Sequence, residues 1–147
     1  MALMTRHAMA EWDANPAPEA PTAPESLKES GLTNGFLCEM LLRTLYTRGA
    51  MIGRDIGQYL CLPFKVIREP LKFLKDEKCI QVDGGDLVGE VSYKFSLTDL
   101  GRKRAQEAME QCAYIGPAPV PLEDYVEQCY RSEEHTSELQ SPYVISY

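Results

Sequence analysis

The chain is poor in the residue types that most often bind metals or carry out catalysis. Of its 147 residues only two are His and one is Trp, and both histidines, His7 and His135, lie near the ends. Tetrahedral zinc sites draw on clustered Cys and His ligands. The five cysteines are instead 17 to 33 residues apart without a C-x-x-C pair: Cys38, Cys61, Cys79, Cys112 and Cys129. No metal and no other cofactor is therefore expected in this chain.

Motifs of enzymes and of membrane proteins are missing as well. The sequence contains neither G-x-S-x-G nor the phosphate-binding loop G-x-x-x-x-G-K-[ST], and its central part has no histidine to act as a general base. No apolar run approaches the length of about 18 residues that a membrane-spanning helix needs. We therefore expect no catalytic residue and no membrane contact. An odd, scattered set of cysteines without a preceding signal segment predicts a reduced, cytoplasmic protein.

The net charge of −7 is unevenly distributed. Residues 26–115 carry 13 Lys and Arg against 12 Asp and Glu, so this part is nearly neutral and its flanks are acidic. Residues 13–25, DANPAPEAPTAPE, alternate Pro with Ala and acids, a composition that favours extended polyproline II and cannot bury apolar area. Residues 1–30 are therefore predicted to be a disordered Ala/Pro-rich leader, and the remaining length suits one core.

Helical periodicity begins near residue 32. In LTNGFLCEMLLRTLYTRG the apolar residues recur three and four positions apart, Thr33 or Asn34 can cap the start, and Gly49 ends the pattern. A second, shorter helix is predicted over 52–60, ahead of the boundary that Pro63 imposes.

The third helical segment is FKVIREPLKFLKDEK, residues 64–78. Pro70 conflicts with it, because a proline inside a helix removes one hydrogen bond and crowds the carbonyl four residues back, at a cost of about 3 kcal/mol. We therefore expect this helix to be kinked or to begin later. Four cations fall at offsets 0, 3, 7 and 10 and so share one stripe, the cation stripe: Lys65, Arg68, Lys72 and Lys75.

The periodicity then changes to that of a β-hairpin. CIQV (79–82) and EVSYKFSL (90–97) are rich in β-branched and aromatic residues, and Gly84 and Gly85 between them suit the positive φ angles of a turn. The next segment, LTDLGRKRAQEAMEQC, predicts a closing helix with Thr98 as its N-cap. Its predicted apolar side consists of Leu100, Ala105, Ala108, Met109 and Cys112.

This order of elements resembles the winged helix-turn-helix fold over residues 31–113. The phrase YKFSLTDLGRKRA, an aromatic strand that runs into L-T-x-L-G-R, is frequent where a wing joins a final helix. The predicted class is α+β, with three helices, a β-hairpin wing, a C-terminal helix and disordered tails.

A winged helix that binds DNA places its third helix in the major groove and its wing over the phosphates, so both need cations. The third helix has the cation stripe but lacks the Asn and Gln that read adenine. The wing loop carries three acids, Asp83, Asp86 and Glu90, and neither Lys nor Arg. We therefore interpret the stripe first as a solvated face, with DNA binding as the alternative.

Arg102, Lys103 and Arg104 form a second basic cluster. They lie in the first turns of the last helix, where the helix dipole disfavours each cation by roughly 0.3 kcal/mol or more. A solvated face is the simpler interpretation, and a docking patch for phosphate or an acidic partner is the alternative. With the cation stripe, these residues are the candidate contacts for nucleic acid or a protein.

A second resemblance is carried by the span from GLTNGFLCEM to EDYVEQ, and above all by YIGPAPVPLEDY at 114–125. This span resembles the segment that precedes the nucleotide-binding module in a group of bacterial AAA-type ATPases. The resemblance implies an N-terminal regulatory winged helix, joined by a Pro-rich spacer (114–131) to a module that is missing here. ATP and Mg are expected only in that module, so the resemblance implies that any ATPase activity of the full-length protein resides there.

The C-terminal stretch RSEEHTSELQSPYVISY (131–147) has apolar residues that fit neither a 3.6-residue nor a 2-residue period. Translated back into codons, RSEEHTSELQS resembles a widely used short-read sequencing adapter, with residues 142–144 as its index and ISY as its next constant block. The resemblance implies that residues 132–147 are translated adapter and that the gene was cut near Tyr130.

The predicted function is therefore that of a regulatory or protein-interaction winged-helix domain from a truncated bacterial AAA-type ATPase. The alternative is a winged-helix DNA-binding transcriptional regulator. The expected partner is a protein or the chain's own ATPase module, with duplex DNA as the alternative. Self-association through the first and last helices is a third reading, and the sequence leaves the oligomeric state open.

Overall fold

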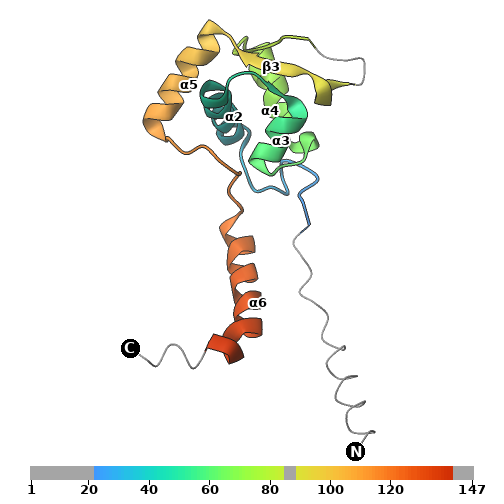
Figure 1. Cartoon of the computed structure of the whole chain (residues 1–147), viewed down its shortest axis with the longest axis vertical. Coiled ribbons are helices and arrows are strands. Elements are labelled where there is room, and N and C mark those ends of the chain that lie inside the picture. The colour runs from blue at the N-terminus through green and yellow to red at the C-terminus, as the bar shows by residue number, and fades with distance from the viewer. Residues whose placement is uncertain (1–21, 85–88, 141–147) are drawn as a thin grey trace, which may run out of the picture. The chain divides into compact units, whose positions relative to one another are not determined.

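The structure is a computed structural model that describes residues 22–84 and 89–140, with side chains described as far as residue 131. Ala23–Tyr125 forms one compact unit, and the described chain from Val126 onward belongs to another. Figure 1 shows the elements, which are in chain order α2 (Asn34–Arg48), β1 (Met51–Ile52), α3 (Gly53–Leu60), α4 (Phe64–Asp76), β2 (Ile80–Val82), η1 (Glu90–Ser92), β3 (Lys94–Leu97), α5 (Asp99–Gln111) and α6 (Leu122–Gln140).

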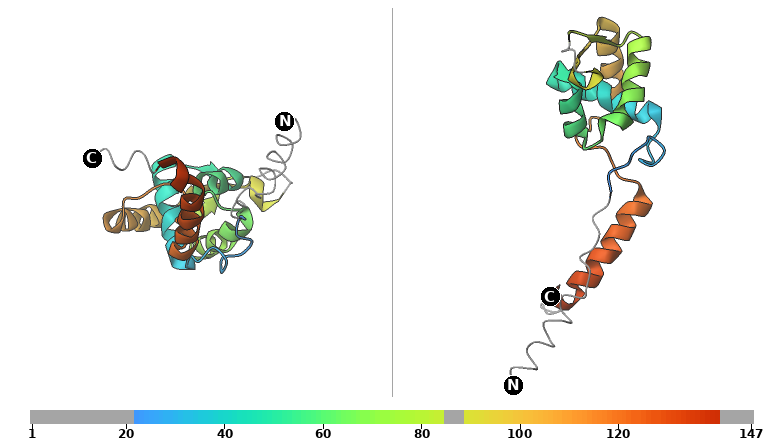
Figure 2. Two further views of the ribbon diagram at one scale, coloured as in Figure 1. Left: turned by 90° about the horizontal axis from the view of Figure 1, so that it is seen from below. Right: turned by 90° about the vertical axis from the view of Figure 1, so that its right-hand side faces the viewer.

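Helix α2 begins and ends where the sequence predicts. The Thr33 hydroxyl accepts a hydrogen bond from the Phe36 N–H and so caps the first turn. Gly49 follows the last turn with φ 82°, a left-handed angle that favours glycine, and its N–H donates to the Leu45 carbonyl. The helix is buried along most of its length, and the views of Figures 1 and 2 place it between α4 and α5.

The wing belongs to a three-stranded antiparallel sheet of order β1-β3-β2, and not to the two-stranded hairpin that the sequence predicts. Met51 pairs with Phe95, and Ile80 pairs with Leu97. Strand β1 has two residues, too few to show an alternating pattern, which is why Ile52 was predicted to start a helix. The helix begins one residue later, at Gly53.

The predicted strand at 90–97 is also shorter, because its first part is the 3-10 turn η1. The Gly53 N–H donates to the Tyr93 carbonyl at 3.0 Å, so this part of the wing lies against the start of α3. A Cβ on residue 53 would come within 3.1 Å of the Val91 carbonyl oxygen and 3.3 Å of that of Glu90. Only glycine permits this close approach without displacing the wing backbone.

Helix α4 runs through Pro70 without a break from Phe64 to Asp76, so the prediction of a later start is wrong. Pro70 is buried, as are its neighbours on the inner face, and burial of four large apolar side chains exceeds the cost of about 3 kcal/mol of one proline. The buried apolar residues are Val66, Ile67, Leu71 and Leu74.

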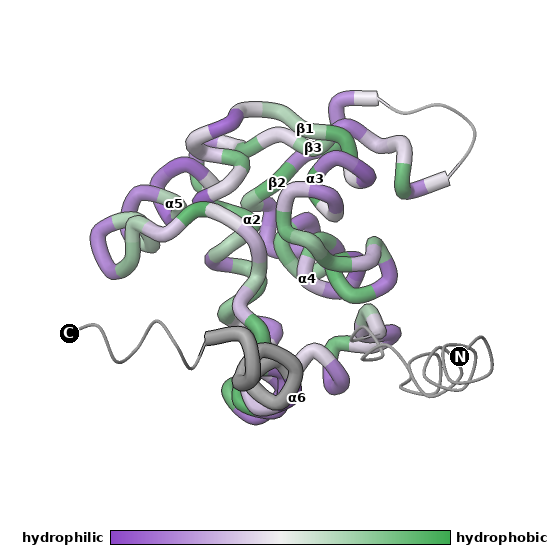
Figure 3. The backbone as a smooth tube through the Cα atoms, turned by 60° about the horizontal axis from the view of Figure 1, so that its bottom comes forward, coloured by the Kyte–Doolittle hydropathy of each residue, from purple (hydrophilic) through white to green (hydrophobic). Residues whose placement is uncertain are grey.

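Helix α5 follows the wing directly, with Thr98 as its N-cap as predicted. The Thr98 hydroxyl accepts from the Gly101 N–H at 3.1 Å and lies 2.6 Å from the Lys78 carbonyl oxygen, to which it donates. Ala105 and Ala108 are buried, but Leu100 is 46% exposed and Cys112 is exposed as well, so their predicted places on the apolar side are wrong. Figure 3 colours α5 mostly hydrophilic, in keeping with its single buried edge.

These elements make an α+β winged helix-turn-helix, as the sequence predicts. The core gathers residues of α2, α3, α4, the sheet and α5, among them Leu41, Ile56, Ile67 and Phe95. Within the described residues no helix combines the length and the apolar character that crossing a membrane requires.

Parts of the predicted leader and spacer have defined structure. From residue 22 the described leader ends in a turn in which the Ser30 N–H donates to the Ser26 carbonyl at 3.1 Å, and Ser30 is buried. The connector after α5 returns to α3, where the Ala118 N–H donates to the Leu60 carbonyl at 2.8 Å. Residues 1–21 lie outside the described residues.

Helix α6 begins inside the predicted spacer and continues through residue 140, into the predicted adapter-derived tail. A preceding proline and two acids in the first turn, Glu123 and Asp124, favour the helix start. The remainder of that predicted tail, residues 141–147, lies outside the described residues. The origin of 132–147 stays a prediction.

Candidate nucleic-acid interface

Helices α3 and α4 are joined by a tight turn that fixes their mutual arrangement. Cys61 ends α3 in a left-handed conformation with φ 55°, and the Leu62 N–H donates back to the Gly57 carbonyl at 3.0 Å. A Cβ on residue 57 would lie 2.9 Å from the Leu62 carbonyl oxygen, so the turn requires glycine there. The pair therefore forms a helix-turn-helix with α4 as its second helix.

All four residues of the cation stripe are exposed on α4. At a rise of about 1.5 Å per residue, Lys65 and Lys75 are separated by roughly 15 Å along the helix axis. A neighbouring strip of the same outer face carries Glu69, Phe73 and Asp76, and Phe73 is 47% exposed. The outer face of α4 is thus divided lengthwise into a cationic side and an acidic side with one aromatic ring.

Arg68 differs from the three lysines of the stripe because an acid neutralises it. Its Nε atom lies 2.6 Å from Oε2 of Glu90, which belongs to η1 of the wing. Both side chains are about half exposed, so this ion pair contributes on the order of 0 to 1 kcal/mol to stability. Within the described residues no acid forms an ion pair with Lys65, Lys72 or Lys75.

The described acids of the wing are engaged in contacts inside the protein. Asp83 accepts hydrogen bonds from the Gln81 amide, at 3.0 Å, and from the Ser96 hydroxyl, across the two strands. Glu90 pairs with Arg68. Asp86 lies outside the described residues. Among the described wing acids, Glu90 therefore has a cationic partner and Asp83 has neutral hydrogen-bond donors, a difference that the sequence did not reveal.

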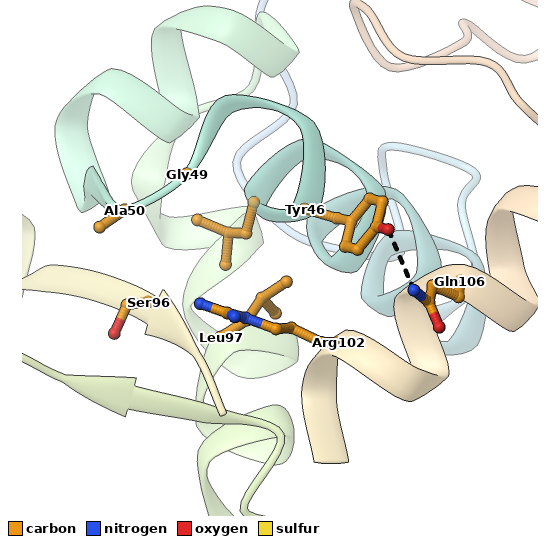
Figure 4. Close-up of a pocket in the computed structure, with 8 residues that line it drawn as sticks. Tyr46, Gly49, Ala50, Ser96, Leu97, Arg102 and Gln106 are labelled. Atoms are coloured by element: carbon orange, nitrogen blue, oxygen red, sulfur yellow. Dashed lines mark hydrogen bonds between the residues drawn. The ribbon is translucent and has the colours of Figure 1, made fainter. Parts of the chain in front are cut away.

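Arg102, Lys103 and Arg104 lie in three different environments. Arg104 reaches Glu77 at the end of α4, with a distance of 3.5 Å between Nη2 and Oε2. Lys103 is exposed. Arg102 extends into an open pocket of about 440 Å³ between α2, β3 and α5, where Gln106 donates to the Tyr46 hydroxyl at 3.1 Å (Figure 4). The side chains of these three consecutive residues therefore have different surroundings, and Arg104 already has an acidic partner in Glu77.

The surroundings of Cys38 disfavour its action as a nucleophile or metal ligand. Cys38 is buried, and burial together with the charges of Cys79 and Glu39 raises the pKa of its thiol to about 11. The thiolate, which is the nucleophile and metal ligand, is therefore disfavoured at neutral pH. Among the described residues no three His, Cys, Asp or Glu side chains are grouped so that they would hold a metal.

Two charged residues with defined contacts were missed by the sequence analysis. Arg43 of α2 is 1% exposed, and its Nη1 donates to the Cys112 carbonyl at 3.1 Å, at the negative end of α5. Arg48 lies over the Tyr59 ring, 4.3 Å from its centroid, and so links the ends of α2 and α3. Arg43 interrupts the apolar pattern of α2, and that interruption was the available signal.

Comparison with known proteins gives likeness at the level of structure alone. No protein-family model matches the chain, and no curated protein matches it. A MarR family regulator from Neisseria meningitidis is 17% identical, with 97% of this chain and 94% of that chain covered and a TM-score of 0.48.

Two further solved structures have similar values. The adhesin competence repressor AdcR from Streptococcus pyogenes is 15% identical, with 95% of this chain and 84% of that chain covered and a TM-score of 0.44. Reduced AbfR bound to DNA is 25% identical, with 78% of this chain and 76% of that chain covered and a TM-score of 0.42.

Proposed function

We propose that the winged helix of residues 31–113 binds duplex DNA and acts as a transcriptional regulator in the cytoplasm, with α4 in the major groove. The observation that carries this proposal is the exposed cation stripe on the second helix of the helix-turn-helix, with three lysines that form no ion pair within the described residues. In this class of domain that helix enters the groove and flanking cations contact phosphates.

The charge arrangement around α4 supports this reading over a merely solvated face. A solvated face usually mixes charges of both signs, whereas here the cations are gathered on the side of α4 from which Arg68 reaches the wing. The wing acid Glu90 is compensated by Arg68, whereas Asp83 keeps its charge and is oriented by hydrogen bonds from the Gln81 amide and the Ser96 hydroxyl. Of the two described wing acids, one therefore has a cationic partner when a phosphate approaches the cation stripe.

A salt titration of DNA binding tests the proposal. The logarithm of the affinity for duplex DNA falls with the logarithm of salt concentration by about 0.9 per phosphate contact. The double variant K65A/K72A is expected to weaken binding and to reduce this slope by roughly 2. A matched control, K28A/R131A, removes two exposed cations that are not candidate contacts and is expected to leave the slope unchanged. Absence of duplex binding at low salt, or an equal effect of both pairs, would reject the proposal.

A second candidate function is a partner-binding regulatory domain of an AAA-type ATPase. It is favoured by the exposed apolar residues of the connector and the start of α6, where Tyr114 is 51%, Val120 63% and Leu122 75% exposed. Such side chains in one short segment are typical of a protein contact. The gene sequence beyond codon 130 tests this candidate, because a G-x-x-x-x-G-K-[ST] loop in that region would provide the ATP and Mg site.

A further inference from the structure

We propose that Arg68 reads a guanine base in the major groove and that Glu90 is the residue that positions it for this contact. The inference rests on the proposed DNA-binding function and adds the base that the domain prefers. It starts from the ion pair between α4 and the wing, in which the Arg68 Nε atom lies 2.6 Å from Glu90 Oε2.

The contact engages one edge of the guanidinium and leaves the other open. Within the described residues neither Nη1 nor Nη2 of Arg68 has a hydrogen-bond or ion-pair partner, and the side chain is 63% exposed. These two nitrogens form the planar fork that donates two parallel hydrogen bonds. Guanine offers two matching acceptors, O6 and N7, on its major-groove edge. A lysine has one charged nitrogen and no such fork.

No other side chain on the outer face of α4 is suited to reading a base in this way. The helix sequence FKVIREPLKFLKD contains neither Asn nor Gln, the residues that read adenine with two hydrogen bonds. Its remaining cations are lysines, which are suited to phosphates as point charges. Arg68 is the single arginine of α4 and stands near the middle of the cation stripe. Base preference contributed by α4 is therefore expected at one principal position, a G·C pair.

The fold, and not chance proximity, places Glu90 in front of Arg68. Glu90 starts η1, whose backbone lies against Gly53, the first residue of α3, through the hydrogen bond from the Gly53 N–H to the Tyr93 carbonyl. The same approach brings the Glu90 carbonyl oxygen to 3.3 Å from the site of a Cβ on residue 53. A carboxylate held by the backbone can restrict the arginine before DNA arrives, so less rotamer freedom is lost on binding.

The experiment is a selection of binding sites from a randomised duplex library, followed by affinity measurements on the selected site and on its G·C to A·T variant. R68K keeps the positive charge but replaces the planar fork with a single ammonium group, so the preference for guanine at one position should fall severalfold from roughly tenfold or more. E90Q keeps the shape and removes the charge, so this preference should fall severalfold while affinity for random duplex does not weaken.

The pair Arg104–Glu77 is a matched control, because it is also an exposed Arg–Glu pair that joins two elements. R104K and E77Q should leave the guanine preference unchanged. Melting curves of all four variants check that the fold is kept. A wild-type selection without a preferred guanine, or an R68K variant that retains the preference, would overturn the inference while DNA binding itself stands. An E90Q variant that tightens all duplexes equally and keeps the preference would overturn the positioning role. Absence of duplex binding at low salt would reject the inference together with the proposed function.

Discussion

The substitution Gly101→Ala tests how α5 is seated on the sheet. A Cβ on residue 101 would overlap the Cys79 carbonyl oxygen, lie 2.8 Å from its carbonyl carbon and come within 3.2 Å of a Leu97 methyl group. The contacting atoms belong to the backbone of Cys79, just before β2. They cannot move aside as the end of a flexible side chain would. The first turn of α5 must move away from the wing if the alanine is to fit.

The expected cost follows from three contributions. Overpacking at a tight contact costs about 1 to 3 kcal/mol. Moving the turn also weakens the hydrogen bond from the Thr98 N–H to the Cys79 carbonyl, 3.0 Å long, and the bond from the Thr98 hydroxyl to Lys78, for roughly 1 kcal/mol each. The better helix propensity of alanine offsets about 1 kcal/mol. The net expectation is a loss of about 3 kcal/mol, which lowers Tm by roughly 12 to 24 °C for a domain of this size.

Urea unfolding followed by circular dichroism at the helical band measures this loss, with thermal melts as a second readout. Gly35→Ala is the matched control, because a Cβ on that glycine of α2 meets nothing within 4 Å. It should leave the free energy of unfolding unchanged or raise it by up to about 1 kcal/mol. A Gly101→Ala protein within about 0.5 kcal/mol of wild type would refute the argument that backbone approach requires glycine here.

Two further predictions concern buried groups of α2. Arg43→Met removes two buried donors, Nε and Nη2, that have no hydrogen-bond partner within the described part of the chain. The free energy of unfolding in urea should therefore rise by about 1 kcal/mol, and a loss of that size would contradict this reasoning. The raised pKa of Cys38, from 9.0 to about 11, means that the folded state keeps a proton that the unfolded state releases. Stability should therefore fall as pH rises from about 9 to about 11, and Cys38→Ala should flatten that part of the curve relative to wild type. A wild-type free energy of unfolding that does not change between about pH 9 and 11 would contradict this prediction.

The arrangement of helices was predictable because each carries its own start and stop signals. Thr33, Gly49 and Thr98 act as caps where the sequence places them. The sheet was harder to predict from the sequence. Strand β1 contributes two residues and pairs with β3, about 40 residues away in the chain, and such pairing leaves no local periodicity. The prediction of a later start for α4 failed for a related reason. The burial that compensates for Pro70 comes from tertiary packing, which the local sequence does not show.

The candidate site was predictable in its cations but not in their partners. Helical spacing alone brings the lysines of the cation stripe to one side of α4. The pairing of Arg68 with Glu90 and the turning of Asp83 toward Ser96 depend on how the wing folds back. Counting charges along the loop could therefore not show that one wing acid, Glu90, is paired with a cation of the stripe.

The hydrogen bond from the Ala118 N–H to the Leu60 carbonyl has a mechanical consequence. Leu60 is the last residue of α3, directly before the turn that leads into α4. The connector is therefore anchored through its backbone at the junction of the two helices of the helix-turn-helix, about 60 residues away in the chain.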